Sequence, residues 1–129
     1  MHSLDVALPS YAAVIVQNLR AVRVRKGLEQ RDLVERMRDL GFTNWHRQTL
    51  SRIEQGHRNL LPGELLGLVV ALETSWGNLL FPAAGEMRIV GLPNGHPVIL
   101  PLQHEMPEGL AEPVWWDGNE AKFAGEAGS

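Results

Sequence analysis

The sequence predicts an all-α domain of five helices over residues 10–81, followed by a short Pro-rich extension over residues 82–129 that is partly β or irregular. Two observations predict this division. Apolar residues recur at three- and four-residue spacing in several windows before Pro82, as on the buried face of a helix. Six of the eight prolines then lie between Pro82 and Pro113, and prolines at that density exclude long helices.

The first two helices are predicted from their periodicity and from the residues at their ends. Ser10 is a suitable N-cap for a helix over about 11–26, and Gly27 suits its end. A second helix is expected over about 29–40, with Gly41 ending it. The link between the two helices is very short.

Three further helices complete the predicted domain. The third is expected over about 45–55, with Thr43 or Asn44 as the N-cap. The fourth begins at Pro62, reaches about residue 73 and is almost wholly apolar, so it should be the central buried helix. A short fifth helix is expected over 76–80, before Pro82.

The extension contains two short β-prone runs, over residues 87–92 and 98–102, which predict a hairpin. Prolines confine both strands to sheet edges. The hairpin either provides a contact between two copies of the chain or covers the helices of its own chain. Residues 104–129 contain six acidic residues and are expected to form a flexible tail.

Charge is unevenly distributed along the chain, whose formal net charge is −3. Residues 19–58 contain ten basic and five acidic residues, whereas the part after Arg58 contains two basic and nine acidic ones. A basic segment of this kind is typical of a surface that binds a polyanion. Most of the cations are arginine, which binds phosphate and guanine through two parallel hydrogen bonds, although a GC-rich genome would also favour arginine.

Several classes of function are disfavoured by what the sequence lacks. The absence of cysteine excludes disulfides, thiolate zinc sites, iron–sulfur clusters and a cysteine nucleophile. The five histidines have no helical metal-binding spacing, and no nucleotide-binding or nucleophile-elbow motif occurs. No apolar run is long enough to span a membrane, and no basic flank of a secretory signal precedes Arg20. We therefore expect a cytoplasmic, nucleoid-associated protein that is not an enzyme and that uses no cofactor and no metal.

One face of the predicted third helix is polar and contains no carboxylate. Long amide and guanidinium side chains of this kind pair with the edges of adenine and guanine in the major groove. Simple exposure to solvent is the alternative explanation of a polar face. The residues on this face are Arg47, Gln48, Ser51, Arg52 and Gln55.

Four strings of residues occur in a characteristic order: Leu19-Arg20-x-Val22-Arg23-x-x-x-Gly27-Leu28-x-Gln30-x-x-Leu33, then Thr49-Leu50-Ser51-Arg52-Ile53-Glu54-Gln55-Gly56-x-Arg58, then Pro62 with the apolar run to Leu72, and finally Leu79-Leu80. Over about residues 16–81 the sequence therefore resembles the Cro, CI-type and Xre helix-turn-helix repressors. The resemblance implies a lambda-repressor-like DNA-binding domain of about five helices.

The resemblance also implies roles for individual residues. Positions that contact DNA bases in the family correspond to Arg47, Gln48, Thr49, Ser51 and Arg52, of which Thr49 and Ser51 are auxiliary. Positions near the DNA backbone correspond to Gln30, Arg31, His57, Arg58 and Asn59. Arg23 and Glu54 match a structural ion pair between the first and third helices.

The connection between the second and third helices departs from the family pattern. It spans residues 38–46 and is longer than the usual tight turn, which leaves the orientation of the third helix open. Phe42 and Trp45 in this connection are expected to fill the core, with packing of Trp45 on sugar and phosphate as the alternative. Arg36 and Arg38 are either phosphate contacts or part of a solvated face.

The sequence thus predicts a sequence-specific regulator of transcription that binds double-stranded DNA. We expect a homodimeric repressor that reads an inverted repeat with the third helix in the major groove. The alternative is a protein-interaction adaptor or antitoxin-like protein whose extension, residues 82–129, binds a partner protein.

Overall fold

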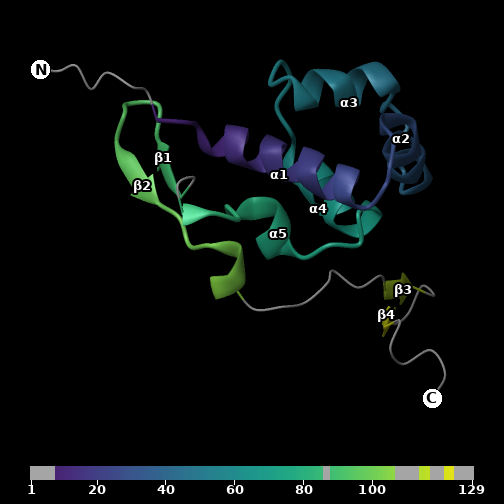
Figure 1. Ribbon diagram of the computed structural model, residues 1–129. Helices are drawn as coiled ribbons and strands as arrows, with labels where there is room; N and C mark the ends of the chain where they lie inside the picture. Colours follow the sequence, from purple (N-terminus) through teal and green to yellow (C-terminus); the bar gives the residue numbers. More distant parts are fainter. Residues whose placement is uncertain (1–7, 86–87, 107–113, 117–120, 124–129) are drawn as a thin grey trace, which may run out of the picture.

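The computed structural model describes residues 8–85, 88–106, 114–116 and 121–123 (Figure 1). Among these residues five helices precede Pro82, as predicted, and the strands all lie in the extension, so the predicted fold class is confirmed. Among the described residues, no helix combines the length and the apolar character that crossing a membrane requires. The helices are α1 (Tyr11–Arg25), α2 (Gln30–Asp39), α3 (Arg47–Glu54), α4 (Pro62–Ala71) and α5 (Trp76–Leu80).

The ends of α1 follow from local chemistry. The Ser10 hydroxyl accepts a hydrogen bond from the Ala13 amide at 3.1 Å and thereby caps the first turn. The chain turns at Gly27, whose φ of 72° is a left-handed conformation that glycine adopts without strain. The helix and the short link that follows therefore lie close to their predicted positions.

All five helices contribute to one hydrophobic core. Helix α4 is the most apolar of them, and Leu68 and Val69 on it are fully buried. Around it lie inward-facing side chains of the other helices, which leave polar residues at the surface. Among the largest fully buried side chains are Leu19, Leu33, Met37, Trp45, Leu50, Ile53, Leu72 and Leu79.

The start of α3 corrects a prediction. The helix begins at Arg47 rather than Trp45, and neither Thr43 nor Asn44 is its N-cap. Instead His46 is the last residue before the helix, and its amide donates to the Thr49 hydroxyl at 3.1 Å. The physical reason is the burial of Trp45, whose side chain is fully enclosed in the core, so that the helix starts only after the extended residue His46.

The long connection between α2 and α3 is held by Arg38 and Phe42. The Arg38 Nη1 atom donates to the carbonyl oxygens of Thr43 and Trp45, at 2.6 and 2.9 Å. The half-buried Phe42 ring packs against the core. Because Trp45 is fully buried, the alternative in which it packs on sugar and phosphate is wrong.

The extension forms two short hairpins. Strand β1 (Ile89–Gly91) pairs antiparallel with β2 (Pro97–Ile99), and Val90 faces Val98. Strand β3 (Val114–Trp116) pairs antiparallel with β4 (Ala121–Phe123), within the segment that was expected to be a flexible tail. A 3₁₀ turn, η2 (Gln103–Glu105), separates the hairpins. The remainder of the predicted tail, residues 107–113, 117–120 and 124–129, lies outside the described residues.

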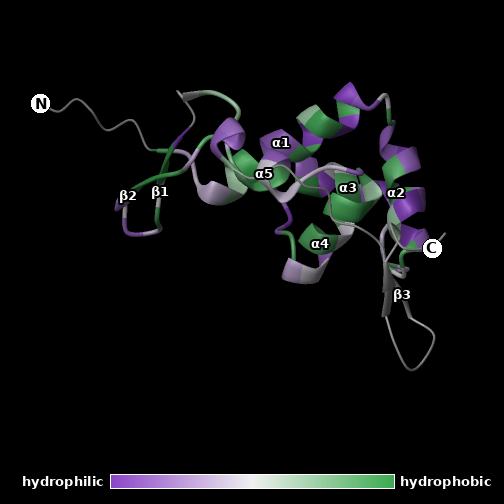
Figure 2. Cartoon of the chain, turned by 90° about the horizontal axis from the view of Figure 1, so that it is seen from below, coloured by the Kyte–Doolittle hydropathy of each residue, from purple (hydrophilic) through white to green (hydrophobic). Residues whose placement is uncertain are grey.

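The extension packs against the helices of its own chain. The Gln103 side chain donates to the carbonyl oxygens of Asn78 and Phe81, at 3.2 and 2.8 Å. The Gly91 amide donates to the Pro9 carbonyl at 2.9 Å, which ties β1 to the residues before α1. In both views, the first hairpin and α2 lie at opposite ends of the helical domain (Figures 1 and 2).

The outer edge of β2 has few free donors. The Leu92 amide donates to the His96 carbonyl, and the Leu100 amide donates to the Arg88 carbonyl. The N–H and C=O groups of the even-numbered residues in and beside β2 therefore face β1. The odd-numbered positions therefore point outward, and two of them, Pro97 and Pro101, have no N–H group.

Candidate nucleic-acid interface

Helix α3 presents a polar face to solvent. Leu50 and Ile53 on its inner side are fully buried, which fixes the opposite side outward. Arg47, Gln48 and Arg52 are exposed there. Within the described part of the chain, none of these three side chains hydrogen-bonds or ion-pairs with another residue, so their donors are available to a ligand.

The two hydroxyl residues of α3 have partners inside the helix. The Thr49 hydroxyl accepts from the His46 amide, and the Ser51 hydroxyl accepts from the Gln55 side-chain amide at 3.3 Å. Both side chains are partly exposed. Thr49 therefore helps to begin the helix, while Ser51 orients Gln55 on the exposed face.

A network of three side chains connects α1, α2 and α3. Arg23 donates to both carboxylate oxygens of Glu54, at 2.7 and 3.0 Å, and also donates to the Leu28 carbonyl at 2.8 Å. Gln30, in the first turn of α2, donates to Glu54 at 3.1 Å. The carboxylate of Glu54 is only 5% exposed. This network fixes the end of α3 against the start of α2 and leaves Gln30 with one amide proton engaged.

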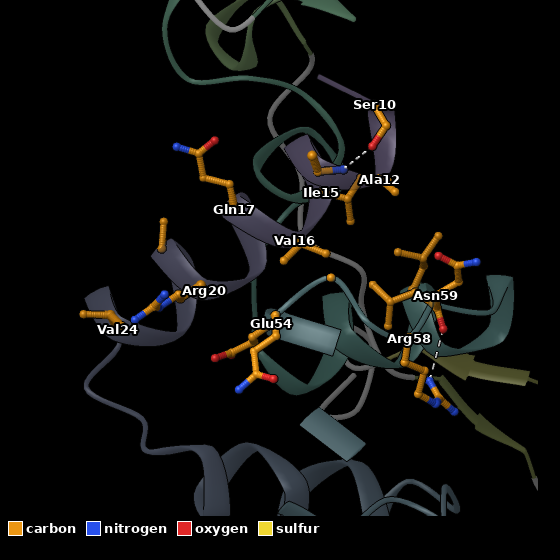
Figure 3. A pocket seen from close by; sticks show the side chains of 16 residues that line it. Ser10, Ala12, Ile15, Val16, Gln17, Arg20, Val24, Glu54, Arg58 and Asn59 are labelled. Carbon is orange, nitrogen blue, oxygen red and sulfur yellow. Dashed lines mark hydrogen bonds between the residues drawn. The ribbon is translucent and has the colours of Figure 1, made fainter. Parts of the chain in front are cut away.

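The segment after α3 contains a second ion pair. Arg58 donates from Nη1 and Nη2 to the two carboxylate oxygens of Glu64 on α4, at 3.0 and 2.9 Å. It also donates to the Asn59 carbonyl at 3.2 Å, as Figure 3 shows. The bonds to Glu64 raise the pKa of Arg58 further above its usual value. His57 and Asn59 are exposed, whereas Arg58 is held against the protein.

Several other cations of the basic segment bind the protein itself. Arg36 donates to the Ala71 carbonyl and Lys26 to the Glu73 carbonyl, both at 2.9 Å, at the end of α4. Positive side chains at that position complement the helix dipole. Arg36 and Arg38, whose Nη1 binds the connection before α3, are exposed and each keep further N–H groups, so both the phosphate contact and the solvated face stay open for them. Arg31 forms an exposed pair with Glu29 at 3.0 Å.

Four arginines of the basic segment have no protein partner among the described residues. Two of them, Arg47 and Arg52, lie on α3, and the other two, Arg20 and Arg25, lie on α1. The sequence-based site did not include Arg20. Its guanidinium lines a small hollow whose other lining residues include Gln30, Ser51 and Gln55, so it lies beside the polar face of α3. The signal that could have identified it is its exposed position one helical turn before Arg23.

An open, mainly apolar groove runs between α1 and the segment after α3 (Figure 3). Val16 and Leu65 are among its apolar lining residues. Figure 3 shows Arg20 on the α1 side and Arg58 with Asn59 on the opposite side. The groove therefore adjoins the polar face of α3 and shares Gln55 with it.

Comparison with known proteins agrees with this geometry. A family model described as a helix-turn-helix domain matches residues 15–80, which is about half of the chain. No curated protein and no solved structure matches the chain significantly. The matched residues begin within α1 and end at the last residue of α5, so they coincide with the five-helix domain.

Proposed function

The chain belongs to the helix-turn-helix domain family, and from this membership we propose that it is a sequence-specific regulator of transcription. In this proposal, α3 enters the major groove of double-stranded DNA. The observation that supports the proposal is the polar face of α3, on which Arg47, Gln48 and Arg52 are exposed and have no protein partner among the described residues. An α-helix fits the major groove, and such side chains distinguish its base pairs.

The residues on this face have distinct proposed roles. Gln48 pairs with adenine through its amide, while Arg47 and Arg52 pair with guanine through two parallel hydrogen bonds. Thr49 and Ser51 make auxiliary contacts to bases, since each hydroxyl retains a donor or a lone pair beyond its contact inside the helix.

Contacts to the DNA backbone are proposed for residues around α3. The free amides at the start of α2 and the remaining amide proton of Gln30 bind one phosphate. Arg31, His57 and Asn59 are exposed and bind further phosphates, and Arg58 contributes through the N–H groups that Glu64 does not use. Arg20, which lines the hollow beside α3, joins this set.

We further propose that the protein acts as a homodimeric repressor on an inverted repeat. Ile89 and Ile99 face each other across the first hairpin and are 41% and 68% exposed. Burying such a pair against its copy in a second chain is favourable, and an inverted repeat requires two α3 helices about one helical turn of DNA apart. A dimer bound at such a site blocks it by occupancy.

Selection on random duplex DNA tests the proposal. The pure protein should enrich an inverted repeat whose half-sites lie about 34 Å apart, and the double variant Arg47→Ala with Arg52→Ala should enrich none. Enrichment of a single half-site would retain DNA recognition and remove the dimer. No enrichment by the wild-type protein would contradict the proposal and favour the adaptor function of the extension.

The dimer contact has its own test. Ile99→Asp places a charge on the proposed contact and should shift the protein from dimer to monomer in sedimentation equilibrium. Leu92→Asp is the matched control, because Leu92 is also exposed (48%) but lies on the other face of the hairpin. Equal effects of the two substitutions, or a wild-type monomer, would contradict a dimer through this face.

A further inference from the structure

Two residues that flank α3 bind the same carboxylate. Trp45, two residues before the helix, donates from its indole Nε1 to Glu64 Oε2 at 2.7 Å. Arg58, four residues after the helix, donates to both oxygens of Glu64. We call these three residues the Glu64 clamp. Because Glu64 belongs to α4, the clamp connects both flanks of α3 to the central helix of the core.

The carboxylate at the centre of the clamp is buried and fully bonded. Glu64 is only 3% exposed. Its Oε1 atom accepts from the Leu61 amide at 2.8 Å and from Arg58, and its Oε2 atom accepts from Trp45 and Arg58. A buried carboxylate is stable only with donors and a countercharge in such geometry, so removing one partner penalises the others. The bonded state of each member therefore depends on the position of the other two.

Helix α3 needs this external support because it has little of its own. It is eight residues long, and only Leu50 and Ile53 on it are buried. The connection before it is longer than a tight turn, and the hydrogen bonds from Arg38 that hold this connection reach only as far as Trp45. The Arg23–Glu54–Gln30 network holds its last turn only. The clamp adds a constraint at both flanks of the helix, beside the burial of Leu50 and Ile53.

We propose that Glu64 is a positioning residue for DNA reading: by binding Trp45 and Arg58 it sets the orientation in which α3 meets the bases. The inference rests on the proposed function, because it concerns the same helix. Recognition of base edges requires side chains held within a fraction of an ångström, whereas attraction to phosphates tolerates displacement. The clamp therefore governs specificity rather than overall affinity for DNA.

The test compares two affinities for each variant: one for the duplex that selection with wild-type protein enriches, and one for a shuffled duplex of equal length. Glu64→Gln keeps the shape of the side chain but removes the charge that Arg58 binds. We expect the ratio of the two affinities to fall by about 10-fold or more, which is the scale of losing one base contact, while the affinity for the shuffled duplex changes little. Trp45→Phe removes only the indole donor and should lower the ratio less.

A stability control separates positioning from a general loss of folding. Val14→Ala removes methyl groups from a buried site on α1 that is not part of the core cluster to which α3 contributes. It should destabilise the protein while leaving the ratio unchanged at a temperature where the protein is folded. If Glu64→Gln and Trp45→Phe also leave the ratio unchanged, the clamp is structural only and the proposal is wrong.

Amide hydrogen exchange gives a second readout that needs no DNA. In Glu64→Gln, protection in α3 should fall more than protection in α1, whereas Val14→Ala should lower both to a similar extent. Equal losses in both helices would contradict the clamp even if the protein binds DNA. A different outcome is also informative: the wild-type protein could show no sequence preference for DNA while the variants show the expected exchange pattern. That result would contradict the proposed function but would support the mechanical link between Glu64 and α3. If Glu64→Gln fails to fold, the affinity ratio and the amide exchange of Trp45→Phe test the proposal in its place.

Discussion

Arg52 and Arg58 are close in the sequence but have different surroundings. Arg52 is exposed on α3 and has no partner in the described part of the chain, whereas Arg58 is bound to the buried carboxylate of Glu64. The two arginines carry the same charge, so charge does not explain why they differ in their availability to DNA. Their partners do, because a guanidinium that already binds a carboxylate has fewer donors for DNA.

Removing Arg52 should weaken DNA binding without affecting the fold. Arg52→Ala should reduce affinity for the selected duplex by about 1–3 kcal/mol and relax the preference at the base that it contacts. The midpoint of urea unfolding should be unchanged, since the side chain is exposed. Fluorescence anisotropy titrations measure the first effect. Arg88→Ala, in the extension, is the control and should leave the affinity for the selected duplex unchanged; a loss of affinity there would show that any cation matters equally.

The stability contributed by Glu64 should depend on pH. Burial alone raises the pKa of Glu64, but hydrogen bonds from Arg58, Leu61 and Trp45, together with the charge of Arg58, lower it below its usual value. A carboxyl whose pKa is lower in the folded state stabilises the fold above its unfolded pKa of about 4.3, and this stabilisation is lost as the pH falls through the folded value.

Urea unfolding of the wild type and of Glu64→Gln, at several pH values between about 3 and 7, tests this expectation. The difference in the free energy of unfolding should be constant near neutral pH and should shrink below about pH 4. Trp45→Phe retains the carboxylate and should keep most of the wild-type dependence on pH. A difference that stays constant down to the lowest pH would contradict the role assigned to the ionised carboxylate.

At the scale of elements, the sequence predicted helices well where their own residues determine the ends. Helix α5 has the predicted bounds, and α1 and α2 differ from prediction only at their terminal residues. Helix α3 starts later than predicted because burial of Trp45, a tertiary contact, overrides the capping preference of Thr43 and Asn44.

The Glu64 clamp was missed for the same reason: its members come from three segments. A signal was nevertheless present, because Glu64 is an isolated acid in an otherwise apolar helix, and such an acid requires a buried partner. The partner itself could not be deduced from spacing. The exposed face of α3, by contrast, follows from helical periodicity within one segment.

Two glycines of α4 should respond oppositely to alanine. A Cβ atom at Gly67 would lie 2.5 Å from the Phe42 ring, whereas one at Gly63 would meet nothing within 4 Å. Gly67→Ala should therefore displace Phe42 and destabilise the domain by about 1–3 kcal/mol. Gly63→Ala should be neutral or stabilising by up to about 1 kcal/mol, since alanine favours the helix. Thermal unfolding of the two variants measures this difference. Equal changes in the unfolding midpoint would contradict the close contact between Gly67 and the Phe42 ring.

For the whole molecule, the number of cations overstates the number of basic side chains whose donors are all free for DNA. The basic segment contains ten cations, but Arg23, Lys26, Arg36, Arg38 and Arg58 bind other groups of the protein. Arg31 has only an exposed and therefore weak ion pair. The structure thus assigns about half of the basic segment to stabilising the fold, a division that composition could not reveal.

The salt dependence of DNA binding measures this division. Each phosphate neutralised contributes about −0.9 to the slope of log K against log salt concentration, so the three arginines proposed to bind phosphate, Arg20, Arg31 and Arg58, imply a slope of about −3 per chain. Full use of the basic segment would give about −9. A titration across salt concentrations on a half-site provides the slope, and Arg20→Ala should reduce its magnitude by about one. A slope near −9 would contradict the partners described for these cations.

The prolines along the outer edge of β2 limit how copies of the chain can assemble. An incoming strand would find donors missing at Pro97 and Pro101, on either side of Ile99, so it could not extend the β1–β2 sheet. The other edge is occupied, since Gly91 bonds to Pro9. Stepwise growth into a fibre through this hairpin is thereby blocked in both directions. An isologous contact through its apolar face, in which both copies use the same residues, would close after the second copy.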